Sequence, residues 1–137
     1  MPAPDLTLDL PAAPLGVPRA RAAVTQLCDL LDVADDVREG IRTAVTEACT
    51  NCVLHAYDGD APHSTYRLEA RQDSDEIVVV VQDWGAGIGG RGDTDAARRL
   101  EGCHGRGLAV MRAVATSVEI ASALGKGTRV ELRFALA

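Results

Sequence analysis

A run of five β-branched residues, Ile77-Val78-Val79-Val80-Val81, constrains the fold of this 137-residue chain more than any other segment. A half-buried strand alternates apolar and polar residues, whereas this run presents apolar side chains to both faces of a sheet. Branching at Cβ also favours strands over helices. We therefore expect a central strand that is covered on both faces, or nearly so.

The other predicted elements indicate what covers that strand. In chain order they are an edge strand at 6–10, helices at 18–31 and 36–57, strands at 64–72 and 77–81, a short helix at 95–100, a helix at 107–115, and strands at 118–121 and 128–136. Pro18 is expected to be the first residue of its helix, and Asp35 or Asp36 is expected to cap the next one. Since no regular β-α-β alternation occurs, we predict an α/β two-layer sandwich, with one mixed or antiparallel sheet and helices on one face. The length fits a single domain, residues 1–137.

Composition narrows the classes of function. The net charge is −6 and aromatic residues make up only 3% of the chain, which argues against nucleic-acid binding. No apolar run approaches the roughly 20 residues that cross a bilayer, and the N-terminus lacks the features of a signal peptide. We therefore expect a cytoplasmic protein without a membrane partner, whose four cysteines are free thiols. Cys49 and Cys52 could form a redox or metal pair, but small buried apolar residues are the favoured interpretation.

The segment from Glu47 to Tyr57 carries the first candidate site. Glu47 and Asn51 are four residues apart in a predicted helix, so they share one face, and His55 lies one turn further along. A carboxylate can accept a proton, and an amide oxygen can hold a hard cation such as Mg²⁺. Polar stripes on helices usually face water, so this pattern needs support from the rest of the chain.

That support comes from glycine, because ten of the 13 glycines fall between Gly85 and Gly127. Asp83 ends the predicted central strand, and Gly85 and Gly87 follow it. There a carboxylate could accept a hydrogen bond from the exocyclic amine of a base, and the glycines would let a planar ring lie against the backbone. A strand-ending aspartate in an ordinary turn is the alternative interpretation.

Two further glycine turns follow. Gly105-Arg106-Gly107-Leu108 opens a helix, where free N–H groups and an arginine suit phosphate oxygens. Gly125-Lys126-Gly127-Thr128 joins two strands, and Thr128 could bond a base or a bridging water, although a plain hairpin remains open. Neither turn matches the P-loop or the dinucleotide fingerprint.

Together these segments resemble the ATP-binding boxes of the gyrase, Hsp90, histidine kinase and MutL (GHKL) superfamily, which share the Bergerat fold. The string Glu47-Ala48-x-Thr50-Asn51-x-x-x-His55-Ala56-Tyr57 and the string Gly105-Arg106-Gly107-Leu108-x-Val110-Met111 are particularly similar to the small bacterial anti-sigma factor serine/threonine kinases. The resemblance covers nearly the whole chain. It implies ATP and Mg²⁺ as cofactors.

The resemblance also implies roles by position. Glu47 would be the general base that takes the hydroxyl proton of a substrate serine, Asn51 would hold Mg²⁺, and Asp83 would bind the adenine amine. The other implied nucleotide contacts are His55, Gly85, Gly87, Gly105, Arg106, Gly107, Leu108 and Thr128. For His55, a helix-end histidine bonded to a loop remains an equal alternative. Arg98 and Arg99 are more typical of solvated charges than of phosphate ligands.

The function that the resemblance implies is an anti-sigma factor kinase. It would phosphorylate a small anti-anti-sigma partner of the STAS type on serine or threonine, sequester a sigma factor, and form a homodimer. An ATP-dependent partner-switch module with little kinase activity is the alternative. A detached catalytic domain of a sensor histidine kinase is disfavoured, because no helical hairpin with a phospho-acceptor histidine precedes the domain.

Overall fold

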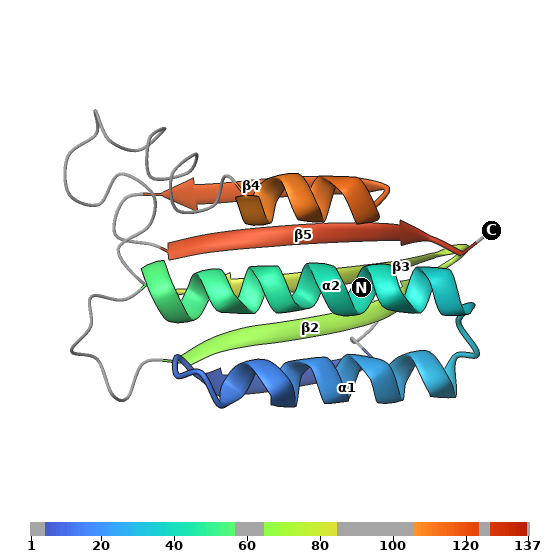
Figure 1. Ribbon diagram of the computed structural model, residues 1–137, viewed down its shortest axis with the longest axis horizontal. Coiled ribbons are helices and arrows are strands. Elements are labelled where there is room, and N and C mark those ends of the chain that lie inside the picture. Colours follow the sequence, from blue (N-terminus) through green and yellow to red (C-terminus); the bar gives the residue numbers. More distant parts are fainter. Residues whose placement is uncertain (1–4, 57–64, 85–105, 124–126, 137) are drawn as a thin grey trace.

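The computed structural model describes residues 5–56, 65–84, 106–123 and 127–136, which form one sheet with helices on one of its faces (Figure 1). The strands are β1 (Leu6–Pro11), β2 (Thr65–Asp73), β3 (Glu76–Asp83), β4 (Ser117–Ala123) and β5 (Gly127–Ala135). Their order in the sheet is β1-β2-β3-β5-β4, and all four pairings between them are antiparallel. The predicted two-layer sandwich is confirmed, with an antiparallel rather than a mixed sheet.

The valine run forms β3, the middle strand of the sheet, as predicted. Ile77, Val79 and Val81 belong to the core beneath the helices. Val78 and Val80 point to the other face, yet they are only 0% and 6% exposed. Long charged side chains of the neighbouring strands flank them, so this face combines a dry apolar strip with a charged surface.

That charged surface is a network on β3 and β5. Arg133 pairs with Glu76 at 2.6 Å and with Glu131 at 3.1 Å, and Arg129 pairs with Glu131 at 3.1 Å. Burial acts to raise the pKa of Glu131, but hydrogen bonds from both arginines outweigh it and the pKa is lowered. The part of this face formed by β3 and β5 is therefore charged, and its arginines and glutamates pair with one another.

Helix α2 (Asp35–Asn51) lies across the middle of the sheet, in contact with β3 and β5. The side chains that it buries are mostly small: Ile41, Ala44, Val45, Ala48 and Cys49. Small residues let the helix axis lie close to the strands, which fixes its rotation about that axis. Helix α1 (Gly16–Leu30) packs beside α2 and against β1.

A third helix, residues 106–114, runs antiparallel to α2 on the same face of the sheet (Figure 1). Two glycines bring the helices together. A Cβ on Gly40 would lie 3.2 Å from the carbonyl oxygen of Val114, and a Cβ on Gly107 would lie 3.1 Å from Oε2 of Glu47. The two helices therefore approach closely at both ends of their contact.

Helix ends differ from the predictions in three places. Helix α1 begins at Gly16, so Pro18 is its third residue and not its first; proline is tolerated there because the first four N–H groups have no partner within the helix. The N-cap of α2 is Ala34, and Asp35 and Asp36 lie in the first turn, where their charge favours the helix dipole without capping it. The predicted long second helix also changes type after Asn51. The predicted helix at 95–100 lies outside the described residues.

The C-terminus of α1 closes with a Schellman motif. The N–H of Val33 donates to the carbonyl of Cys28 at 3.0 Å, and the N–H of Asp32 donates to the carbonyl of Asp29 at 3.3 Å. Val33 and Cys28 are both buried, which supplies the hydrophobic contact typical of this motif. Asp32 occupies the left-handed position, with φ of 54°.

Replacing Asp32 by glycine should therefore stabilise the protein. Glycine adopts a positive φ without the steric cost of a Cβ, so we expect D32G to raise the free energy of unfolding by about 0.5–1 kcal/mol. Urea unfolding would measure the change. The matched control is D36G, an exposed aspartate in the first turn of α2, which should lower the free energy by about 0.5 kcal/mol. Destabilisation by D32G would contradict the account of this helix end.

Candidate nucleotide site

Glu47 and Asn51 lie side by side near the C-terminal end of α2, opposite the start of helix 106–114. A Cβ on Gly107 would lie 3.1 Å from Oε2 of Glu47 and 3.4 Å from Nδ2 of Asn51. A side chain at this position would press against both polar groups, so glycine permits the close approach of the two helices here. The glycine start of helix 106–114, which is far from α2 in the sequence, thus lies against the carboxylate and the carboxamide. Both side chains are half-buried, so they remain within reach of a ligand.

Directly after Asn51 the helix changes to a π-helical turn, Cys52–Ala56. Such turns widen the helix, shift the direction of the following side chains and are frequent at functional sites. Cys52 is buried and points into the molecule, next to the half-buried Asn51. The backbone of His55 lies in the π turn, but its side chain is outside the description, so its predicted role stays a prediction.

Asp83, the last residue of β3, is the one charged residue buried in the described part of the chain, with 5% exposure. Its Oδ1 accepts the backbone N–H of Thr128 at 3.2 Å, and its Oδ2 lies 3.9 Å from the Sγ of Cys52. Burial, followed by the charge of Asp83, raises the pKa of Cys52 well above its usual value, so the thiol stays protonated and donates. Burying a carboxylate is costly unless donors surround it, and these contacts come from two different elements.

Gly127, the first residue of β5, brings Thr128 to Asp83. Its φ is +85°, and a Cβ there would lie only 2.0 Å from the carbonyl oxygen of Asp83. No other residue type can occupy this position without moving the backbone. The Thr128 side chain itself turns away to the Ser122 hydroxyl, 3.1 Å distant. Thr128 therefore supports the predicted adenine side through its backbone N–H.

Trp84 follows Asp83, but its side chain is exposed, whereas that of Asp83 is buried. The guanidinium of Arg67 lies 5.6 Å from the centre of the indole ring, and Trp84 is 49% exposed. Arg67 also pairs with Asp9 at 2.8 Å. The indole is therefore engaged with a cation of β2.

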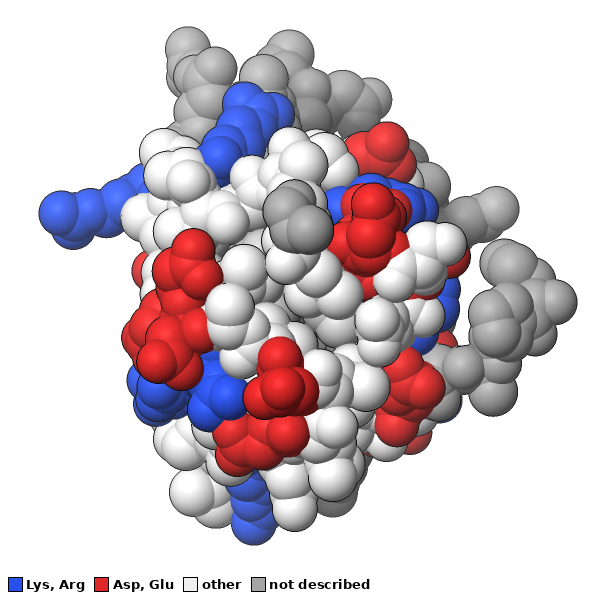
Figure 2. Space-filling model, turned by 90° about the vertical axis from the view of Figure 1, so that its right-hand side faces the viewer, with Lys and Arg blue, Asp and Glu red and all other residues white. Residues whose placement is uncertain are grey.

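Many acidic side chains of the described residues lie at the opposite end of the molecule. Figure 2 views the end at which α1 leads into α2 and β2 turns into β3, and acidic side chains surround it. They include Asp29, Asp32, Asp35, Asp36 and Glu39 near the helix connection, and Asp73, Asp75 and Glu76 at the hairpin. Because the 17 residues of α2 span roughly 25 Å, more than two Debye lengths in physiological salt, this charge is screened from the Glu47 end.

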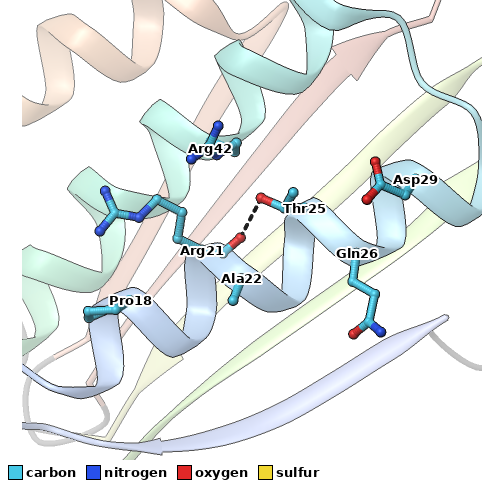
Figure 3. A pocket seen from close by; sticks show the side chains of 7 residues that line it. All are labelled: Pro18, Arg21, Ala22, Thr25, Gln26, Asp29 and Arg42. Carbon is cyan, nitrogen blue, oxygen red and sulfur yellow. Dashed lines mark hydrogen bonds between the residues drawn. The ribbon is translucent and has the colours of Figure 1, made fainter.

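A separate open groove of about 380 Å³ lies along α1 and α2 (Figure 3). Six of its lining residues come from α1 and one, Arg42, from α2: Pro18, Arg21, Ala22, Thr25, Gln26, Asp29 and Arg42. None of the predicted site residues lines it. This groove between the helices is therefore distinct from the candidate nucleotide site.

The remaining predicted site residues are placed as follows. Arg106 is exposed at the start of helix 106–114, and Leu108 is half-buried against the core. Gly85, Gly87 and Gly105 lie outside the described residues, as do Arg98 and Arg99. Cys49 and Cys52 are buried free thiols, and the described residues contain no cluster of His, Cys, Asp and Glu fit for a metal. No described helix is both long and apolar enough to cross a membrane.

Two residues that contribute to the site were missed in the sequence. Gly127 was placed in a glycine turn that resembles an ATP-binding box, and Cys52 was interpreted as a small buried residue, but neither was expected to contact Asp83. A glycine at the start of a strand gives no sign that it approaches Asp83. The contact of Cys52 depends on a π turn, which the helical periodicity did not reveal.

Comparison with known proteins gives a family for this architecture. Residues 10–134 match the model of the histidine kinase-like ATPase domain. The chain belongs to this family, which confirms the predicted superfamily and an ATP-binding type of domain. It is 36% identical to an anti-sigma F factor of Oceanobacillus iheyensis over 119 residues, 81% of this chain and 78% of the relative. It is 34% identical to an anti-sigma F factor of Caldanaerobacter subterraneus, over 82% of this chain and 80% of the relative.

Solved structures share the fold. The structure of the RsbU and RsbW domains of a Mycobacterium tuberculosis protein superposes with a TM-score of 0.72 at 20% identity. The match covers 98% of this chain, which spans about a third of that longer protein. The histidine kinase domain of a blue-light activated kinase from Erythrobacter litoralis superposes with a TM-score of 0.56 at 18% identity, covering 89% of this chain and 60% of that one. At these identities the likeness concerns the fold alone.

The close approach at Gly127 leads to a test. Alanine there would combine a positive φ with a Cβ inside contact distance of the Asp83 backbone, so G127A should lower the free energy of unfolding by at least about 2 kcal/mol. Thermal or urea unfolding measures this. The control T128A keeps the backbone N–H that Asp83 accepts and should cost less than about 1 kcal/mol. Equal stability of G127A and the wild type would contradict the geometry.

Proposed function

We propose that this protein is an ATP-dependent serine/threonine kinase that phosphorylates a small anti-anti-sigma partner of the STAS type and sequesters a sigma factor. The single observation that carries the proposal is the convergence of Glu47 and Asn51 on Gly107, at the glycine start of helix 106–114. Membership of the ATPase family and the anti-sigma F factors among the relatives support it. A homodimer is part of the proposal and follows from the family resemblance.

The carboxylate of Glu47 would act on the partner's hydroxyl group. Its half-exposed position lets it accept the proton of a serine or threonine as the hydroxyl oxygen attacks the terminal phosphorus of ATP. The new oxygen–phosphorus bond forms as the bond between phosphorus and the bridging oxygen breaks, and ADP leaves. Glu47 thereby orients and deprotonates the nucleophile.

The amide of Asn51 would hold Mg²⁺, together with phosphate oxygens. Both its Oδ1 and its Nδ2 lie within 4 Å of the position that a Cβ of Gly107 would fill, so the amide borders the glycine start of helix 106–114. An amide oxygen is a ligand that Mg²⁺ accepts, and Mg²⁺ commonly takes only one or two protein ligands beside phosphates. The chemistry that the ion supplies is neutralisation of charge on the phosphates.

The buried carboxylate of Asp83 would read the base. One lone pair of a carboxylate oxygen can accept the exocyclic amine of adenine while another accepts Thr128. If a base carried a carbonyl oxygen in place of the amine, that oxygen and the carboxylate would face each other as two hydrogen-bond acceptors. The site is therefore expected to prefer adenine nucleotides.

Removal of the proposed base should separate binding from transfer. We expect E47Q and E47A to bind ATP with an affinity within about threefold of the wild type but to transfer phosphate to an anti-anti-sigma protein at least about 100-fold more slowly. Radiolabelled ATP and Mg²⁺ with the candidate partner measure transfer, and calorimetry measures binding. The control E39Q changes an exposed glutamate of the same helix, which pairs with Arg42, and should leave both quantities unchanged.

Two results of this experiment speak against the proposal. Equal transfer by E47Q and the wild type would remove Glu47 as the base. ATP binding without measurable transfer by the wild type, with every partner that it captures, would favour a partner switch without kinase activity.

A second variant tests the base-reading role. In D83N an amide donor faces the adenine amine, so we expect ADP affinity to fall by at least about tenfold. Calorimetry with ADP measures it, and D73N, at the exposed end of β2, is the control. Unchanged affinity in D83N would refute this assignment of the pocket.

A further inference from the structure

The buried thiol of Cys52 stands out because it contacts the carboxylate proposed to read the base. Its Sγ is 3.9 Å from Oδ2 of Asp83, a long contact suited to a weak sulfur donor. Cys52 is 6% exposed and Asp83 is 5% exposed, so little water competes for the contact. In such surroundings even a weak hydrogen bond to a charged group is strengthened.

The two oxygens of Asp83 have donors on different elements. Thr128 of β5 donates its backbone N–H to Oδ1, and Cys52 of the π turn donates its thiol to Oδ2. The torsion between Cβ and the carboxyl group of an aspartate has a broad minimum. A donor on each oxygen restricts that rotation and sets the plane of the carboxylate.

We propose that Cys52 is a positioning residue for adenine recognition: its thiol holds the Asp83 carboxylate in the plane in which that carboxylate accepts the adenine amine. This inference rests on the proposed nucleotide site and adds a residue to it. Loss of the thiol removes this donor from Oδ2 while Thr128 still donates to Oδ1, so the plane of the carboxylate is held less firmly. Discrimination between bases then falls more than affinity for the phosphates.

The position of Cys52 in the chain gives the contact a further consequence. It directly follows Asn51, which contacts Gly107 at the start of helix 106–114, whereas Cys52 faces inward to Asp83. Two consecutive residues thus serve the two ends of the proposed nucleotide. The contact holds the π turn that follows α2 close to the end of β3.

The test compares two nucleotides in four variants. Inosine diphosphate has a carbonyl oxygen where ADP has its amine, so the ratio of their dissociation constants reports recognition of the amine. Calorimetry of the full chain with each nucleotide gives the ratio. We expect C52A to reduce the preference for ADP by about three- to tenfold, the range expected for one hydrogen bond. The matched control is C49A, which truncates a cysteine of the same helical region that is 0% exposed and lies beside Tyr66. C49A should keep the wild-type ratio of dissociation constants even if its melting temperature falls as much as that of C52A.

A second pair of variants, C52S and C52V, keeps the test informative if C52A does not fold. C52S keeps a donor, and C52V fills the space without one, so C52S should retain a higher ADP preference than C52V. A C52A ratio within twofold of the wild type, or equal ratios for C52S and C52V, would overturn the role of Cys52. If the wild type fails to bind ADP at all, the proposed function itself is wrong, which is a distinguishable result.

Discussion

The packing of α2 against the sheet is the constraint on which the rest of the structure depends. Its buried face consists mainly of small residues, among them Ala44, Ala48 and Cys49, which leave little freedom of rotation against β3 and β5. Once that face is set, Glu47 and Asn51 can only point toward helix 106–114. The core therefore determines the direction of the two polar groups that carry the proposed chemistry.

Much of this arrangement could be predicted from the sequence. The valine run identified the central strand because five consecutive β-branched residues fit no other position in a small domain. The spacing of Glu47 and Asn51 placed them on one helix face, since helical periodicity is a strong local signal. Gly107 was recognised as part of a helix start, and the structure places it against both side chains.

What the sequence did not reveal depends on contacts between distant segments. The start of α1 was placed two residues late because Pro18 fits the third position of a helix as well as the first. The π turn at Cys52–Ala56 has no periodic signature, and five residues cannot establish one. The contacts of Asp83 with Thr128 and Cys52 join residues 45 and 31 positions apart, and only the tertiary structure brings them together.

The π turn also constrains how this chain can vary. It places two side chains that point in different directions within a single peptide unit: Asn51 contacts Gly107 at the start of helix 106–114, and Cys52 contacts Asp83 at the end of β3. An insertion or deletion of one residue immediately before the turn would rotate one of these side chains by about 100° relative to the other. The number of residues in this segment therefore sets the angle between the two side chains, so a substitution within it is less disruptive than a change in its length.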